Sequence, residues 1–84
     1  MSEGESGDMG KLVEAIAKAL VDSPDGVAVQ ASHSELGSVI ELRVAPGELG
    51  RVIGKQGRTA RSIRNILAAA GEKLNKRFAL EIRE

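Results

Sequence analysis

The chain has 84 residues, of which 42% are hydrophobic, so it has room for one small soluble domain with a modest core. It contains no cysteine and no apolar run of membrane-spanning length, so we expect a cytoplasmic protein without disulfides, cysteine-ligated metal or membrane contact. Twelve acidic residues balance twelve basic ones, but residues 1–48 hold nine of the acids and residues 49–84 hold nine of the bases. The second part of the chain is therefore the part able to attract an anion.

The first ten residues carry acidic side chains among glycines and serines and have no signal-peptide pattern. We predict that residues 1–10 form a disordered acidic tail and that residues 11–84 form the folded domain. A helix is expected over about residues 11–21, because apolar residues recur there at helical spacing. Its predicted core face consists of Leu12, Ile16, Ala19 and Leu20.

Two strands and a short helix are predicted next. Alternating apolar residues indicate strands over 27–31 and 39–44, joined by a hairpin loop over 33–37. Pro46 suits the first position of a helix, where its fixed φ is helical and no N–H is needed, so we predict a short helix over 46–52.

The remaining residues predict a second long helix and a last strand. The helix covers residues 58–70 and ends at Gly71, and the strand covers residues 77–83. The side chains expected to face the core are Ala60, Ile63, Ile66, Leu67, Ala70, Phe78, Leu80 and Ile82.

The most informative stretch is residues 52–58, which read Val-Ile-Gly-Lys-Gln-Gly-Arg immediately before the second long helix. Gly54 and Gly57 lack a Cβ, so this loop can adopt positive φ and lie close to a sugar-phosphate chain. The N-terminus of the following helix would present N–H groups and a positive dipole end to the same phosphate. Five basic residues and no acid occur between Glu48 and Glu72. The pattern favours single-stranded nucleic acid as the ligand, although a tight helix–helix turn beside a solvated helix face would give the same residues.

Enzymatic readings fit these residues poorly. A nucleotide-binding P-loop needs four residues between its glycines and then Lys-Ser/Thr, whereas Gly50 and Gly54 enclose three and Lys55 precedes Gln56. No dinucleotide fingerprint or catalytic triad is recognisable. His33, the only histidine, has no second ligand at metal-binding spacing. We therefore expect a non-catalytic protein with no cofactor and no metal.

The predicted order α-β-β-α-α-β, with Ile-Gly-x-x-Gly at residues 53–57, resembles the KH family in its type II topology. The resemblance covers residues 11–84 and is closest to small bacterial proteins that consist of a single KH domain. It implies an α+β fold, a three-stranded sheet packed against three helices, that clamps about four nucleotides of single-stranded RNA or DNA. The RNA-binding residues expected from it are Val52, Ile53, Gly54, Lys55, Gln56, Gly57, Arg58 and Arg61, with Ile63 and the strand over 39–44 completing an apolar groove.

The same resemblance implies a cellular role and protein partners. It suggests an RNA chaperone or post-transcriptional regulator that affects cell-envelope growth. The active form would be a monomer, a homodimer or a heterodimer with a larger KH-containing protein of the Jag type. An alternative is a protein-interaction module whose loop no longer binds RNA. Intact Lys55 and Gln56 between the glycines favour RNA binding, because an interaction module could carry acidic or bulky residues there.

Overall fold

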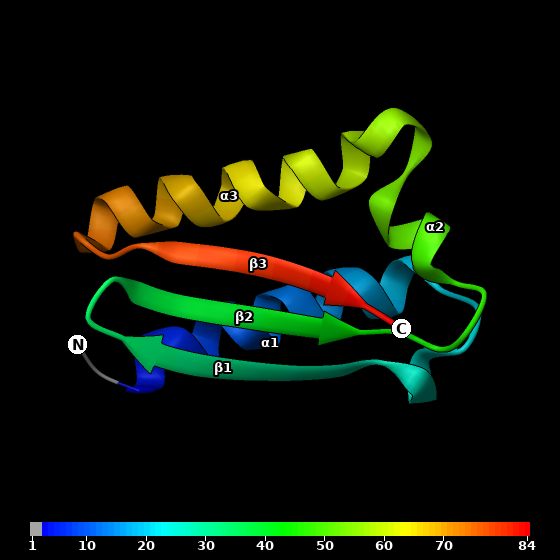
Figure 1. Cartoon of the computed structure of the whole chain (residues 1–84), viewed down its shortest axis with the longest axis horizontal. Helices are drawn as coiled ribbons and strands as arrows, with labels where there is room; N and C mark the ends of the chain where they lie inside the picture. The colour runs from blue at the N-terminus through cyan, green and yellow to red at the C-terminus, as the bar shows by residue number, and fades with distance from the viewer. Residues whose placement is uncertain (1–2) are drawn as a thin grey trace.

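The computed structural model describes residues 3–84, with side chains from Asp8 onward, as a three-stranded sheet covered by helices on one face (Figure 1). The strands are β1 (Ala28–Ser34), β2 (Gly37–Arg43) and β3 (Phe78–Arg83), arranged in the order β1-β2-β3. β1 is antiparallel to β2, and β2 is parallel to β3. The helices are α1 (Glu3–Leu20), α2 (Leu49–Ile53) and α3 (Arg58–Leu74), with short 3-10 turns η1 (Pro24–Gly26) and η2 (Lys55–Gly57). The predicted α+β architecture of type II KH topology is confirmed.

The core lies between the sheet and the two long helices. Alternate residues of the central strand, Ile40 and Leu42, are fully buried, and those of β3 alternate in the same way. Since neighbouring side chains of a strand point to opposite faces, one face of each strand meets the helices and the other meets solvent. The buried apolar residues are Val13, Ala17, Val21, Val27, Ile40, Leu42, Val44, Val52, Ala60, Ile63, Leu67, Phe78 and Leu80.

The first helix differs from the prediction in its start and its face. It begins at Glu3, so residues 3–10 of the predicted tail are helical, and residues 1–2 lie outside the described residues. The fully buried side chains are Val13 and Ala17, whereas Leu12, predicted to face the core, is 37% exposed. Gly10 lies on the same buried face, next to Val29 of β1. Among the residues that the structure describes, no helix is long and apolar enough to cross a membrane.

Two predicted helix boundaries were wrong. Pro46 lies in a turn closed by the Glu48 N–H donating to the Ala45 carbonyl at 3.1 Å, with Gly47 at φ +89° as a type II turn requires. α2 therefore begins later, at Leu49. Gly71 lies inside α3, which continues to Leu74. The glycine is needed here for packing, because a Cβ would sit 2.5 Å from the Lys76 carbonyl oxygen and crowd the returning chain.

Candidate nucleic-acid interface

The glycine loop, residues 54–57, connects α2 to α3 by a sharp change of direction at the top right of Figure 1. Gly54 takes φ +79° and ψ 171°, and its N–H donates to the Gly50 carbonyl at 2.8 Å, which ends α2. Gln56 and Gly57 both take positive φ, at 57° and 74°. The Gly57 N–H returns to the Gly54 carbonyl at 3.1 Å, so the loop is closed by its own backbone. The prediction that the long helix begins next to Gly57 is confirmed by its start at Arg58.

The two glycines are required for different reasons. A Cβ on Gly54 would lie 2.7 Å from the Cβ of Thr59, so the fold itself excludes a side chain there. A Cβ on Gly57 would meet no atom within 4 Å. The surface at Gly57 is therefore open to a ligand that comes close to the backbone.

α3 offers an anion site at the same place. It has 17 residues, and its N-cap, Gly57, provides no side-chain hydrogen bond to the first turn. The Arg58 N–H donates to the Lys55 carbonyl, and the next N–H groups of that turn lack intrahelical partners and share the positive end of the helix dipole. A phosphate at Gly57 would meet both.

All five basic residues near the loop are exposed, and three of them have no ion pair and no backbone contact with the described residues. Lys55 and Arg61 form no side-chain hydrogen bond or ion pair with the described residues, and Arg58 makes one long contact, from Nη2 to Gln56 Oε1 at 3.4 Å. The other two are engaged in the protein. Arg51 pairs with Asp22 at 2.9 Å, and Arg64 Nη2 donates to the Leu80 carbonyl of β3 at 3.4 Å. Lys55, Arg58 and Arg61 are therefore the basic side chains of this cluster that no ion pair or backbone contact holds among the described residues.

The apolar groove differs from its prediction. Val52 is fully buried, so its side chain supports the loop from the core and presents no surface to a ligand in this structure. Ile63 is also buried, at 3% exposure.

The predicted strand over 39–44 corresponds to β2, which β3 separates from α3. Ile53 is half-buried against the core, and Ile82 of β3 is similarly half-buried. The strand beside α3 is thus β3, because a parallel crossover returns the chain to the far side of β2.

A buried carboxylate that sequence reasoning missed holds α2 in place. Glu48, at 8% exposure, accepts the Asp22 N–H at 2.6 Å and the Ser23 N–H at 3.2 Å. With the Arg51–Asp22 pair, this gives α2 two attachments to the loop that follows α1. No local pattern could have shown it, because its partners are 25 and 26 residues away along the chain.

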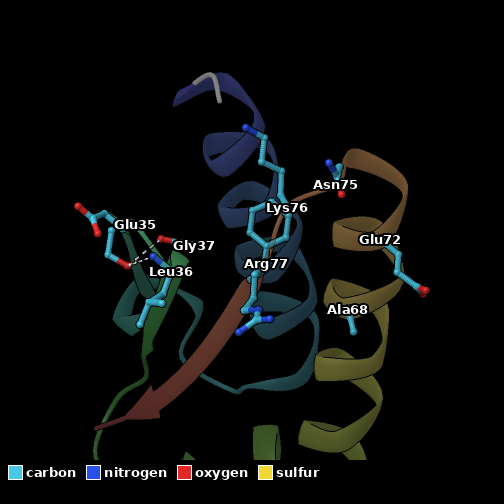
Figure 2. Close-up of a pocket in the computed structure, with 10 residues that line it drawn as sticks. Glu35, Leu36, Gly37, Ala68, Glu72, Asn75, Lys76 and Arg77 are labelled. Carbon is cyan, nitrogen blue, oxygen red and sulfur yellow. Dashed lines mark hydrogen bonds between the residues drawn. The ribbon is translucent and has the colours of Figure 1, made fainter.

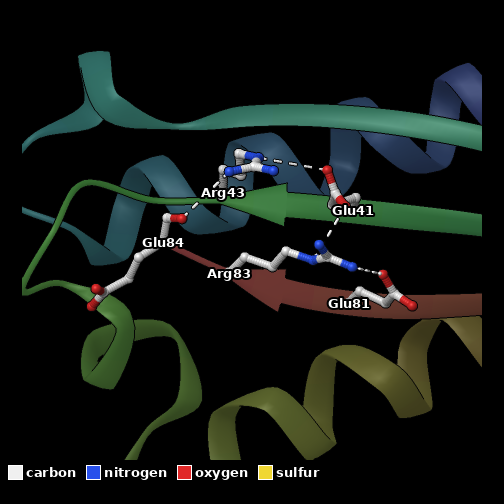
Figure 3. A network of polar contacts seen from close by, with 5 residues as sticks. All are labelled: Glu41, Arg43, Glu81, Arg83 and Glu84. Atoms are coloured by element: carbon white, nitrogen blue, oxygen red, sulfur yellow. Dashed lines mark hydrogen bonds and ion pairs between the residues drawn. The ribbon is translucent and has the colours of Figure 1, made fainter.

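The charged side chains on the solvent face of the sheet are paired with one another (Figure 3). Glu41 of β2 contacts the Nε of both Arg43 and Arg83, at 3.6 and 3.2 Å, and Arg83 Nη2 contacts Glu81 at 2.8 Å. The hydrogen bond that Arg83 donates to Glu81 and the charge of Glu41 raise the pKa of the Arg83 guanidinium. This face therefore has less free positive charge than the glycine loop.

Comparison with known proteins defines the class. Era, solved in complex with MgGDPNP and nucleotides 1506–1542 of 16S ribosomal RNA, superposes with a TM-score of 0.57 at 21% identity, over 89% of this chain and 29% of that one. The shared fold with its helix–loop–helix over residues 49–74, together with the match to a KH-domain family model, places the chain among KH domains of type II topology.

Within that class, residues 10–82 match the KhpA/KhpB KH domain, and the chain belongs to this family. The RNA-binding protein KhpA of Caldanaerobacter subterraneus subsp. tengcongensis is 54% identical over 74 residues, which cover 88% of this chain and 99% of that protein. The RNA-binding protein KhpA of Aquifex aeolicus is 58% identical over 73 residues, which cover 87% and 92%.

Proposed function

We propose that this chain binds single-stranded RNA at the glycine loop and catalyses no reaction. The observation that carries the proposal is the coincidence at Gly57 of open space, positive φ and the uncapped N-terminus of α3. A phosphate is the ligand group that uses all three, because it needs N–H donors, positive potential and close backbone approach. Lys55 and Arg58 add full charges beside it.

The proposed contact residues are those exposed around the loop. Gly54, Lys55, Gln56 and Gly57 would hold the sugar-phosphate backbone, with Arg58 and Arg61 at their side. Half-buried Ile53 would provide apolar contact for a base. The only aromatic residue, Phe78, is buried, so extensive base stacking is absent and modest affinity with weak sequence selectivity follows.

The names of the relatives extend the proposal from site to role. Several proteins 41–58% identical to this chain are named RNA-binding protein KhpA. We propose that this chain likewise binds RNA, and that it does so in the cytoplasm as an RNA chaperone or post-transcriptional regulator affecting cell-envelope growth.

A charge reversal in the loop tests the site. Lys55→Asp combined with Gln56→Asp should abolish binding to single-stranded RNA, because two carboxylates would face the phosphates while no buried contact is lost. Fluorescence anisotropy with a labelled oligonucleotide gives the affinity, and thermal melting shows that the fold is intact. The matched control is Lys11→Asp combined with Ala15→Asp, which makes the same charge change at exposed positions of α1. Wild-type affinity in the loop variant would rule out this site.

Competition between strand states tests the mode of binding. A grip on unstacked bases requires single-stranded RNA, because a duplex hides its base edges in a deep, narrow groove. Binding by charge alone would favour the duplex. The chain should therefore prefer a single strand to a duplex of equal length at physiological salt, and equal or tighter duplex binding would contradict the mechanism.

A second candidate function, a protein-interaction module, has one observation in its favour. Ile66 is 46% exposed and Leu74 is 38% exposed, and with Ala70 they form an apolar stripe at four-residue spacing on α3. This stripe could bind a second copy of the chain or a larger protein of the KhpB/Jag type. Sedimentation of the wild type and of Ile66→Lys, with RNA affinity measured on both, separates the functions. An interaction module would form an Ile66-dependent dimer but show no RNA binding.

A further inference from the structure

A hollow of about 760 Å³ lies at the end of α3 far from the glycine loop, but its acidic side chains turn away from it (Figure 2). Glu35 extends from the β1–β2 turn and Glu72 from α3, and their carboxylates point outward on opposite sides. A hydroxyl without a partner among the described residues lies instead at the other end of α3, next to the glycine loop.

This hydroxyl belongs to Thr59, the only threonine of the chain and the second residue of α3. The backbone nitrogen and the Cβ of Thr59 lie 2.9 and 2.7 Å from the position that a Cβ on Gly54 would take, so the residue packs against the loop. Its side chain is half-buried, and its Oγ1 forms no hydrogen bond with the described residues. Among those residues, no side-chain oxygen that is sealed from solvent lacks a hydrogen-bond partner. The Oγ1 of Thr59 is therefore open to solvent, and a ligand at the loop can reach it.

Thr59 supplies a hydrogen-bonding group that the rest of the loop lacks. Phosphate oxygens only accept hydrogen bonds, and the side chains of Lys55 and Arg58, like the N–H groups of α3, only donate them. Within residues 54–61, the side chains with an accepting atom are those of Gln56 and Thr59. Gln56 Oε1 is already contacted by Arg58 Nη2 at 3.4 Å. A ligand hydroxyl, which both donates and accepts, therefore finds its matching group at Thr59.

The group of RNA with this property is the ribose 2′-hydroxyl. It is bonded to the sugar carbon next to the one that carries the 3′ phosphate. A phosphate held at Gly57 and the start of α3 therefore brings a 2′-hydroxyl to the same turn of the helix. DNA has a hydrogen at this position, and the 2′-hydroxyl is the group by which a protein distinguishes RNA from DNA at a given site.

We propose that the Thr59 hydroxyl binds the 2′-hydroxyl of the ribose whose phosphate lies at the glycine loop, and that this contact makes the chain prefer RNA to single-stranded DNA. The proposal rests on the proposed RNA-binding function and adds to it a residue that selects the sugar. One hydrogen bond of this kind corresponds to about three- to tenfold in affinity.

Oligonucleotides that differ only in their sugars test the proposal. Fluorescence anisotropy gives the affinity for one uracil-free tetranucleotide as RNA, as DNA, and as four DNA chimeras that each contain a single ribose. The wild type should bind the RNA about three- to tenfold more tightly than the DNA. One of the four chimeras should recover most of that difference, because one 2′-hydroxyl meets Thr59.

Substitutions at Thr59 assign the preference to its hydroxyl. Thr59→Val keeps the branched shape and removes the hydroxyl, so it should bind RNA and DNA equally, with an affinity for DNA within about twofold of the wild type. Thr59→Ala is a second variant without the hydroxyl, and Thr59→Ser, which keeps it, should retain the RNA preference. The control Ser62→Ala removes an exposed hydroxyl further along α3 and should retain the preference too. Thermal melting shows that each variant is folded.

Each outcome decides between the proposals. Equal affinity of the wild type for RNA and DNA overturns the role of Thr59 and leaves the glycine loop as the binding site. An RNA preference that survives in both Thr59→Val and Thr59→Ala also overturns it, and so does an equal loss of RNA and DNA binding in both variants. A preference shared by all four sugars would show that the strand conformation is selected instead of one hydroxyl. If the wild type binds neither RNA nor DNA, the proposed RNA-binding function is overturned and the role of Thr59 with it.

Discussion

The salt dependence of RNA binding should distinguish a local clamp from a diffuse basic surface. Of the five basic residues from Arg51 to Arg64, Arg51 is paired with Asp22 and Arg64 donates to the Leu80 carbonyl. We expect the other three, which have no ion pair or backbone contact among the described residues, to make the phosphate contacts. At about −0.7 per phosphate for a single strand, the plot of log affinity against log salt should have a slope of about −2, whereas engagement of all five would give about −3.5.

Single substitutions assign the slope to residues. Lys55→Ala should flatten it by about 0.7, the contribution of one phosphate, because Lys55 is exposed and has no competing partner among the described residues. Arg51→Ala and Arg64→Ala should leave the slope almost unchanged. Anisotropy titrations between about 50 and 300 mM salt give the three slopes. A wild-type slope near −3.5, or equal flattening by all three substitutions, would refute the local clamp.

Two further predictions concern what the protein itself requires. Gly54→Ala should destabilise the fold by more than about 2 kcal/mol, because it combines positive φ with a collision at Thr59, whereas Gly57→Ala should cost about 1 kcal/mol, from φ alone. Gly57→Ala should nevertheless weaken RNA binding, so melting curves and titrations of the two variants together show which glycine serves the ligand. Glu48→Ala should cost about 1–3 kcal/mol in urea unfolding, because it removes the acceptor of the Asp22 and Ser23 N–H groups, and an unchanged midpoint would show that water replaces the carboxylate.

Much of the fold could be predicted because its signals are local. The alternation of Ile40 and Leu42, the strand around Leu80 and the turn-forming glycines of the loop each depend on a few neighbouring residues. The start of α3 at Arg58 followed from the loop for the same reason.

The errors came from contacts between distant segments. Ile66 and Ala70 fit an apolar arc in the sequence, yet Gly71 lies on the buried face because the returning chain at Lys76 touches it. The sequence shows Arg51 and Arg64 in the same basic stretch as Lys55 but cannot show their partners, Asp22 and the Leu80 carbonyl, which belong to other segments. The sequence gives the number of charged residues, but only the folded structure shows which of them contact other residues.

The parallel pairing of β2 with β3 makes RNA binding a reporter of folding. Residues 44–77 form the connection between these two neighbouring strands, and the glycine loop lies in the middle of that connection. Pairing over so large a sequence separation is slow compared with forming the β1–β2 hairpin or a helix. A chain that has formed only local structure has not yet paired β3 with β2, so the connection that holds the glycine loop is not yet closed. In stopped-flow refolding, recovery of RNA affinity should therefore follow the slowest phase of sheet formation and lag behind the recovery of helix signal.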